Sequence, residues 1–188
     1  MSIQHEFHRR CPWWLGYFLI NPLRRWRQDP KKILAPYVRE GMTVLEPGPG
    51  MGFFTLELAR LVGPSGRVVA VDVQDRMLSA LGRRATRAGL RDRLDLRLVR
   101  DGGLGVEDLA GKADFALAFA MVHEVPDPAR LFREIRAALK PGGTLLLCEP
   151  AGHVKEPQYA ETLDLARAAG FTVGESPAIA LSRSTFLR

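Results

Sequence analysis

Apolar residues follow two different periods along the chain from residue 43 onward. Short apolar runs predict strands, over residues 43–46, 67–72, 94–99, 113–120, 144–149, 171–175 and 179–187. Between most of them, apolar residues recur every three or four positions, which predicts helices, over residues 52–62, 75–88, 128–139 and 156–169. Strands separated by helices of roughly 10–15 residues form βαβ units, so we expect an α/β fold with a mainly parallel, doubly wound sheet.

Glycine, proline and capping residues mark the ends of these elements. The segments 63–66 (GPSG) and 140–143 (KPGG) predict turns, and Asp127 before a proline predicts a helix start. The last two strands are joined through residues 176–177 (SP) and are typical of a hairpin.

The first 29 residues stand outside this alternation. Their aromatic side chains are interleaved with arginines, and Asp29-Pro30 predicts the start of the next helix. We expect residues 1–29 to form an appendage or lid and residues 30–188 to form the main domain. The appendage could close a pocket, anchor at a membrane interface, or simply pack on the sheet.

Composition suits one globular domain, since 46% of the 188 residues are hydrophobic and 26% are charged. The formal net charge of +6 permits an anionic partner, although a solvated arginine-rich surface is the plainer explanation. The two cysteines, Cys11 and Cys148, form no disulfide framework, which favours the cytoplasm. The apolar run 13–20 is too short to span a bilayer and lacks a signal-peptide cleavage site, so at most peripheral membrane contact is expected.

The turn after the first predicted strand carries the strongest chemical signal. It reads Glu-Pro-Gly-Pro-Gly-Met-Gly over residues 46–52. Glycines there let the backbone approach a ligand at the switch point of the sheet. A dinucleotide site requires GxGxxG, but Phe53 stands where the third glycine belongs. Glu46 repels a pyrophosphate and attracts a cation, which favours an amino-acid-like ligand over a nicotinamide dinucleotide.

The second predicted strand ends at Asp72, about 20 residues after the glycines, where an acidic side chain can accept hydrogen bonds from both ribose hydroxyls. A solvated helix cap is the alternative role for this residue. Together with the glycine turn, Asp72 predicts a site for an amino acid joined to a nucleoside.

These segments resemble a known family. Residues 44–52 (VLEPGPGMG), 69–72 (VAVD) and 141–147 (PGGTLLL) are similar to the motifs of class I S-adenosylmethionine-dependent methyltransferases, notably small members of the ubiquinone/menaquinone type. The resemblance covers about residue 33 to the C-terminus. It implies a Rossmann-like seven-stranded sheet with helices on both faces and the last strand antiparallel.

The resemblance also implies which residues bind S-adenosyl-L-methionine. The turn would hold the methionine part, Asp72 the ribose, Val73 the adenine face, and Asp101 with Gly102 the adenine edge. The run after Asp101 is Gly-Gly-Leu-Gly rather than the Leu-Pro of many relatives, which weakens the adenine assignment. The full predicted set is Glu46, Gly48, Pro49, Gly50, Gly52, Phe53, Asp72, Val73, Met77, Asp101, Gly102 and Ala120.

Residues after the fourth and fifth strands border the expected methyl acceptor. Methyl transfer depends mainly on alignment of the reactants, with a base required only if the acceptor loses a proton. His123 is the candidate base, and Glu149 and His153 are further candidates, although each could be structural instead. His5, His8 and Cys11 recur at intervals of three but are poor grounds for a metal site, and we predict none.

The expected function is methyl transfer to a small, hydrophobic or planar acceptor. Methyltransferases of this class that act on nucleic-acid amino groups carry an Asn/Asp-Pro-Pro-aromatic tetrapeptide after the fourth strand, and those that act on cytosine carbon carry a Pro-Cys nucleophile. The sequence has neither motif, so a nucleic-acid substrate is not expected, although RNA modification by another set of residues stays open. A protein substrate, a non-catalytic S-adenosylmethionine-binding protein and a nicotinamide-dependent oxidoreductase are the alternatives. A homodimer could help to close a shallow acceptor pocket.

Overall fold

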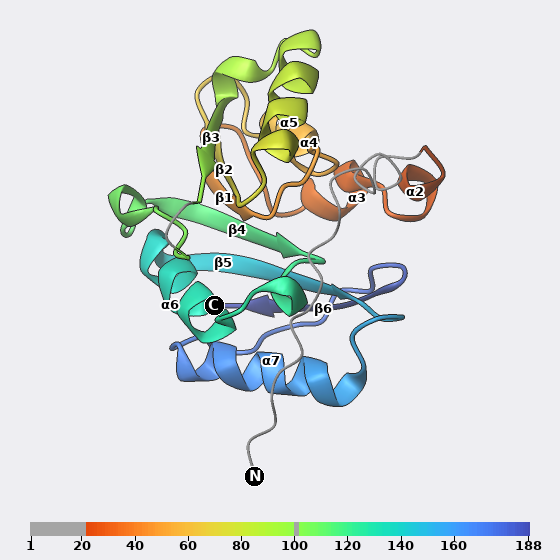
Figure 1. Ribbon diagram of the computed structural model, residues 1–188, viewed down its shortest axis with the longest axis vertical. Coiled ribbons are helices and arrows are strands. Elements are labelled where there is room, and N and C mark those ends of the chain that lie inside the picture. The colour runs from red at the N-terminus through yellow and green to blue at the C-terminus, as the bar shows by residue number, and fades with distance from the viewer. Residues whose placement is uncertain (1–21, 100–101) are drawn as a thin grey trace.

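The computed structural model describes residues 22–99 and 102–188 (Figure 1). Its sheet has six strands in the order β3-β2-β1-β4-β5-β6. The first five run parallel, and β6 pairs antiparallel with β5. The strands are β1 (Thr43–Pro47), β2 (Arg67–Asp72), β3 (Leu94–Leu98), β4 (Ala113–Phe119), β5 (Leu139–Pro150) and β6 (Ser182–Leu187).

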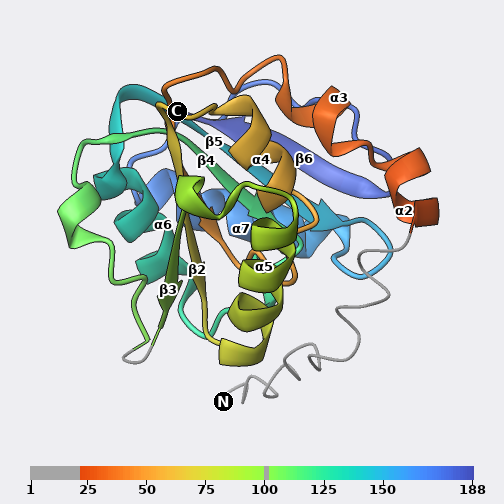
Figure 2. The ribbon, with the colours of Figure 1, turned by 90° about the horizontal axis from the view of Figure 1, so that it is seen from above.

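Helices cover both faces of the sheet, as predicted (Figures 1 and 2). The helices α3, α4 and α5 pack on one face, and α6 and α7 pack on the other. None of the helices in the described part of the chain has the length and apolar character needed to cross a bilayer. The α-helices are α2 (Pro22–Arg27), α3 (Pro30–Leu34), α4 (Thr55–Leu61), α5 (Asp75–Arg87), α6 (Pro128–Ala138) and α7 (Glu156–Ala168); short 3₁₀ turns are η2 (Arg91–Arg93), η3 (Glu107–Leu109) and η4 (Val122–Glu124).

The period of two within each strand divides the apolar side chains between two cores. In β2, Val68 and Ala70 face the core under α4 and α5, while Val69 and Val71 face the core under α6. A strand that is buried on both faces is a continuous apolar run in the sequence, which is why these strands could be predicted.

The capping residues act as the sequence indicates. The Asp29 carboxylate accepts a hydrogen bond from the backbone N–H of Lys31 at 3.0 Å, at the start of α3. The Asp127 carboxylate accepts one from the N–H of Arg130 at 2.8 Å, at the start of α6. Each cap satisfies a donor that the first helical turn leaves unpaired.

The prediction of a seventh strand was wrong for the described part of the chain. Residues 171–175 contribute a single antiparallel bridge, between Val173 and Leu187, instead of a strand. Backbone bonds continue on both sides of the bridge, as from Gly174 N–H to the Phe186 carbonyl at 2.8 Å. Gly174 weakens a strand, and the nearby Pro177 has no N–H to extend the pairing.

Further boundaries differ from the prediction, and the last strand begins at Ser182 instead of residue 179. The segment 140–143, predicted as a turn, lies inside β5, where the pairing with β4 shifts register between Ala113 and Phe115. The strand therefore continues through these residues, and the irregular pairing opposite them accommodates the extra length. The helix predicted from residue 52 begins at Thr55, because Gly52 has a left-handed φ of +82° that a right-handed helix excludes.

The strand order reverses between β1 and β4, which defines the switch point of the sheet. The connections after these strands depart to opposite faces and leave an opening at their carboxyl ends. The glycine turn after β1 and the segment 120–125 after β4 therefore meet there.

Gly52 is a specific requirement of this architecture. A Cβ at Gly52 would lie 2.3 Å from Leu81 Cδ1, in addition to the strain of the left-handed φ. We expect Gly52→Ala to lower the free energy of unfolding by about 2–4 kcal/mol, measured by urea denaturation. Gly89→Ala is the matched control: φ is +66° but a Cβ meets nothing within 4 Å, so we expect a loss of about 1 kcal/mol. Equal losses would contradict the role of packing against Leu81.

Candidate functional site

A cleft of about 790 Å³ lies at the carboxyl ends of the central strands. Its walls come from the turn after β1, the ends of β2 and β4, the segments that follow β4 and β5, and helix α2. Of the predicted cofactor-binding residues, the following line it: Glu46, Gly48, Pro49, Gly50, Phe53, Asp72, Val73, Met77, Gly102 and Ala120. Gly52 does not line the cleft, because it packs against Leu81 behind the turn. Asp101 lies outside the described residues.

The turn after β1 offers bare backbone to the cleft. Gly48 donates its N–H to the Val71 carbonyl at 2.8 Å, which holds the turn against the end of β2. Gly50 has a φ of +54°, and a Cβ built there meets no atom within 4 Å. The turn therefore leaves room for a ligand directly against its backbone.

Glu46 is a buried carboxylate aimed at this turn. Its side chain is 4% exposed, and its Oε2 atom has no hydrogen-bond partner. Burial, with a smaller contribution from the charge of Asp72, raises the pKa of Glu46 to about 8. A cationic ligand group beside Oε2 would satisfy the carboxylate and favour its ionised form.

Asp72 connects the glycine turn to the end of β2. Its Oδ2 accepts from the Gly50 N–H at 3.2 Å, and its Oδ1 accepts from the Gln74 N–H at 2.9 Å. Burial raises the pKa of Asp72 above its ordinary value. Each oxygen keeps a further lone pair for a ligand hydroxyl.

The wall beyond Asp72 is apolar. Val73 is 48% exposed although it lines the cleft, and Met77 packs beneath it in a small cluster with Met51 and Ala80. An exposed valine in a concave site offers a flat apolar ligand a surface to cover. The combination of Glu46, bare glycines, Asp72 and this wall fits an amino acid joined to a nucleoside.

On the other side of the switch point, the structure brings together two residues that the sequence indicated separately. Glu149, at the end of β5, is 1% exposed and does not line the cleft. Its Oε1 accepts from the Val122 N–H at 2.8 Å, and its Oε2 contacts Nδ1 of His123. Since an ionised carboxylate only accepts, Nδ1 carries the proton and Nε2 is left with a lone pair.

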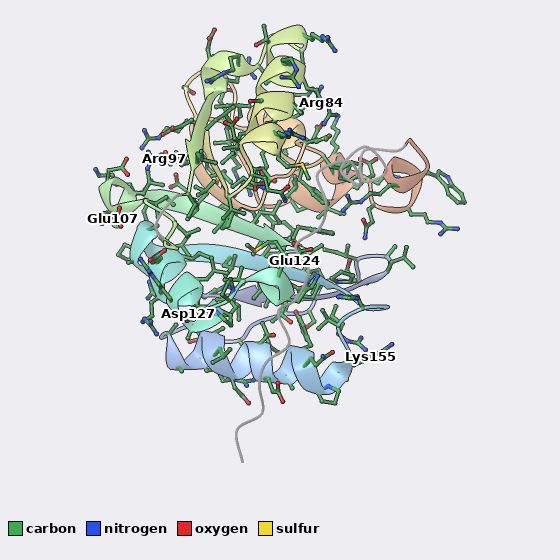
Figure 3. The ribbon with its side chains drawn as sticks, in the orientation of Figure 1. Arg84, Arg97, Glu107, Glu124, Asp127 and Lys155 are labelled. Carbon is green, nitrogen blue, oxygen red and sulfur yellow. The ribbon has the colours of Figure 1, made fainter. Side chains whose placement is uncertain are left out.

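The carboxylates around His123 raise its pKa. Burial by itself lowers the pKa of His123, but the hydrogen bond and charge of Glu149, together with the charge of Glu124, raise it above its ordinary value. The Oε1 atom of Glu124 lies 3.8 Å from Nε2, and Figure 3 places Glu124 near the end of β4. The ring of His153 lies 4.9 Å from that of His123, so both imidazoles lie at the cleft.

Ala120 joins β4 to this region in a strained conformation. Its φ is +56°, in the left-handed region that residues with a Cβ rarely adopt, and its N–H donates to the Cys148 carbonyl at 2.7 Å. The reversal turns the chain sharply from β4 toward Val122 and His123. Strain of this kind is commonly found at functional sites.

Arg24 is a cleft residue that the sequence did not single out. It belongs to α2, and its guanidinium carbon lies 4.3 Å from the ring centre of Phe53 and 5.7 Å from that of Phe119. Burial lowers the pKa of Arg24 to about 10. Nothing in the local sequence distinguishes it from the neighbouring arginines, because its position depends on how α2 packs against the turn after β1.

The described residues contain no group of three or more His, Cys, Asp or Glu side chains that could hold a metal ion. His5, His8 and Cys11, which were weighed as ligands, lie outside the described residues.

Comparison with protein families matches residues 18–176 to the family described as "Methyltransferase domain". The chain belongs to this family. The identification made from the sequence motifs is thereby confirmed, and with it S-adenosylmethionine as the family's cofactor.

Individual relatives agree with this assignment. The chain is 31% identical to the ubiquinone/menaquinone biosynthesis C-methyltransferase of Pasteurella multocida over 120 residues. This aligned segment covers 64% of this chain and 44% of that protein. It thus spans less than half the length of this relative. A SAM-dependent methyltransferase from Aquifex aeolicus shares the fold, with a TM-score of 0.83, 23% identity and coverage of 95% of this chain and 98% of that one. Fibrillarin from Aeropyrum pernix, with natively bound S-adenosylmethionine, has a TM-score of 0.62 at 18% identity over 81% of this chain and 68% of that one.

The acidity of Glu46 predicts proton release on ligand binding. Below about pH 8 the free carboxyl is largely protonated, and the ammonium of S-adenosylhomocysteine should displace that proton. Affinity should therefore rise with pH between 6 and 7.5, by up to about tenfold per unit. Calorimetry in buffers of different ionisation enthalpy measures the released proton.

Glu46→Gln should bind more weakly and release no proton. Glu57→Gln, which changes a buried carboxylate outside the cleft, should behave as the wild type. Proton release that persists in Glu46→Gln would place its source elsewhere.

The position of Asp72 predicts a role in nucleoside binding. Asp72→Ala should weaken S-adenosylhomocysteine binding by about 1–3 kcal/mol, because it leaves ribose hydroxyls and the Gly50 N–H unpaired. Asp75→Ala, an exposed residue in the first turn of α5, should leave the affinity unchanged. Equal affinities of the two variants in calorimetry would remove Asp72 from the site.

Proposed function

We propose that the protein transfers a methyl group from S-adenosylmethionine to a small planar acceptor whose proton is taken by His123. The observation that carries the proposal is one cleft with two chemically different sides. The buried, unpartnered Oε2 of Glu46 lies beside bare glycines on one side, and the His123–Glu149 pair lies on the other.

On the cofactor side, each predicted residue has a defined task. Glu46 binds the ammonium of the methionine part, Asp72 binds the ribose hydroxyls, and Val73 and Met77 cover the adenine. Arg24, at the Phe53 end of the cleft, supplies the positive charge for the methionine carboxylate. Bound in this way, S-adenosylmethionine supplies an electrophilic methyl group whose bond electrons return to sulfur as the acceptor's electron pair forms the new bond.

The acceptor side favours a flat, apolar molecule. The last residues of β4 and β5 and the segments that follow them bring several apolar side chains to the cleft, namely Phe119, Met121, Val125, Pro126 and Pro150, beside the polar His123, Glu124 and His153. The relative from Pasteurella multocida is named for C-methylation in quinone biosynthesis, and a phenolic ring fits the same chemistry. We therefore propose a phenol or hydroquinone as the acceptor class.

His123 removes the proton that such an acceptor must lose. The O–H proton of the phenol passes to Nε2, and a ring carbon of the resulting phenolate attacks the methyl group. The C–H proton of that carbon then moves to the phenol oxygen, which restores the aromatic ring, and the proton on Nε2 passes to solvent. Glu149 keeps the proton of the free imidazole on Nδ1 and stabilises the imidazolium that forms. Because Glu149 is also fixed by the Val122 N–H, it acts as a positioning residue.

A transfer assay tests the activity directly. The full chain is incubated with methyl-labelled S-adenosylmethionine and a panel of phenols and hydroquinones, with RNA and protein samples in parallel. Labelled small-molecule product supports the proposal. Binding of S-adenosylhomocysteine without transfer to any member of the panel would indicate a non-catalytic binding protein, and label in RNA or protein only would overturn the acceptor class.

The role of Glu149 predicts a shift in the titration of His123. In Glu149→Gln the raised pKa of His123 should fall, because the hydrogen bond and charge that favour the imidazolium are removed. Nitrogen-15 imidazole NMR measures this without any acceptor. In the wild type the neutral, active imidazole is lost as pH falls through the raised pKa, so the acidic limb of kcat should move to lower pH in Glu149→Gln.

With an active acceptor in hand, His123→Asn should lower kcat by about 10²–10⁴-fold with little change in the affinity for S-adenosylhomocysteine. His153→Asn is the matched control at the same cleft, and its loss should be much smaller. A wild-type kcat for His123→Asn would exclude it as the base.

A further inference from the structure

The two most exposed large hydrophobic side chains of the described residues are Trp26 and Leu181. Trp26, on α2, is 79% exposed, and Leu181, in the turn before β6, is 64% exposed. Single exposed apolar residues are common, but a tryptophan this exposed is unusual in a soluble domain. If these two residues lie close together in space, one docking surface can account for the exposure of both.

Hydrogen bonds bring the segment that carries Trp26 next to the turn that carries Leu181. The Gln28 side chain, two residues after Trp26, donates from Nε2 to the Ala180 carbonyl at 2.7 Å and to Ser182 Oγ at 3.1 Å. Both acceptors adjoin Leu181. Figure 2 shows α2 next to β6, in agreement with these hydrogen bonds.

The backbone at Leu181 adds an independent observation. Its φ is +62°, a left-handed conformation that is strained for a residue with a Cβ. The Leu181 carbonyl accepts from the Ala151 N–H at 2.9 Å, which holds the turn in place. Glycine or asparagine would suit this turn better, so a leucine that is both strained and exposed points to a use for its side chain.

Basic residues follow the exposed tryptophan in the sequence, at the end of α2 and on α3. Arg27, Lys31 and Lys32 are all exposed, and the intervening Asp29 carboxylate is engaged as the cap of α3. Aromatic and aliphatic side chains flanked by cations are characteristic of segments that lie in the headgroup region of an anionic bilayer.

We propose that this edge, formed by Trp26, Arg27, Lys31, Lys32 and Leu181, docks on bilayers that contain anionic phospholipids. The cations bind the headgroup phosphates while the indole and the leucine enter the interface. A protein partner fits less well, because a stable protein interface buries about 800 Å² per partner with shape complementarity. Two protruding side chains joined through polar contacts do not provide such a surface, whereas a headgroup layer needs none.

Docking at this edge has a consequence for the cleft. Arg24 lies on the same six-residue helix and lines the cleft. The bilayer would therefore meet the molecule beside the cleft, where an apolar acceptor dissolved in the membrane is within reach. Membrane binding itself does not depend on methyl transfer and is measured without cofactor or acceptor.

Vesicle sedimentation with the full chain tests the proposal. Wild-type protein should bind vesicles of phosphatidylglycerol and phosphatidylcholine, bind phosphatidylcholine vesicles at least about tenfold more weakly, and dissociate as salt is raised. The double variant Trp26→Ala/Leu181→Asn should lose binding to the anionic vesicles by at least about tenfold. Asparagine suits the left-handed turn, so this variant keeps the fold, which circular dichroism checks.

Matched controls separate this edge from general charge and hydrophobicity. Leu98→Ala removes an exposed leucine from the opposite edge strand β3, and Arg133→Glu reverses an exposed charge on α6; both should bind as the wild type. Lys32→Glu should bind more weakly than Arg133→Glu. The proposal is overturned by a wild type that ignores anionic vesicles, by a double variant that still binds them, or by light scattering in which the double variant alone loses a wild-type dimer.

Discussion

Burial of the Glu46 carboxylate beside a turn of bare glycines is the constraint on which the cleft depends. The sheet reverses its strand order between β1 and β4, so the end of β1 opens into a cavity instead of being covered by the next crossover. A carboxylate at that point has little solvent and one unpartnered oxygen. The free protein therefore holds a buried polar atom that a ligand group in the cleft can satisfy, and Asp72 holds the glycine turn beside it through the Gly50 N–H.

Much of the fold was predictable because it depends on local periodicity. The boundaries of β2 and α5 agree with the sequence within a residue, since buried parallel strands are continuous apolar runs and helix ends carry their own signals. The errors lie where pairing overrides a local signal. The glycines at 142–143 look like a turn, but β5 continues through them because β4 accommodates the register shift. The segment around Val173 has strand character, yet it pairs through a single bridge.

In the candidate site, too, the residues within one local motif could be predicted, and the contacts between distant segments could not. Glu46, Gly50 and Asp72 could be proposed from the sequence, because strand, turn, helix and strand follow one another without interruption between Thr43 and Asp72. The contact between His123 and Glu149 could not, because the two residues are 26 positions apart and meet only through the pairing of β4 with β5. Arg24 was missed for a related reason: an appendage helix reveals its contacts only when the surface that it packs against is known. Gly52 is predicted to bind the cofactor from its place in the motif; it does not line the cleft, a Cβ there would meet Leu81, and its role toward the cofactor stays a prediction.

Strand β5 pairs with β4 on one side and with β6 on the other, so the part of the cleft that it supports is held more firmly than the connecting segments. Glu149 occupies this strand, with Arg183 opposite it in register. The anchor of the imidazole thus belongs to the interior of the sheet, while the apolar walls belong to connecting segments. Substitutions in those segments can therefore reshape the cleft while the strand that supports the contact between Glu149 and His123 stays unchanged.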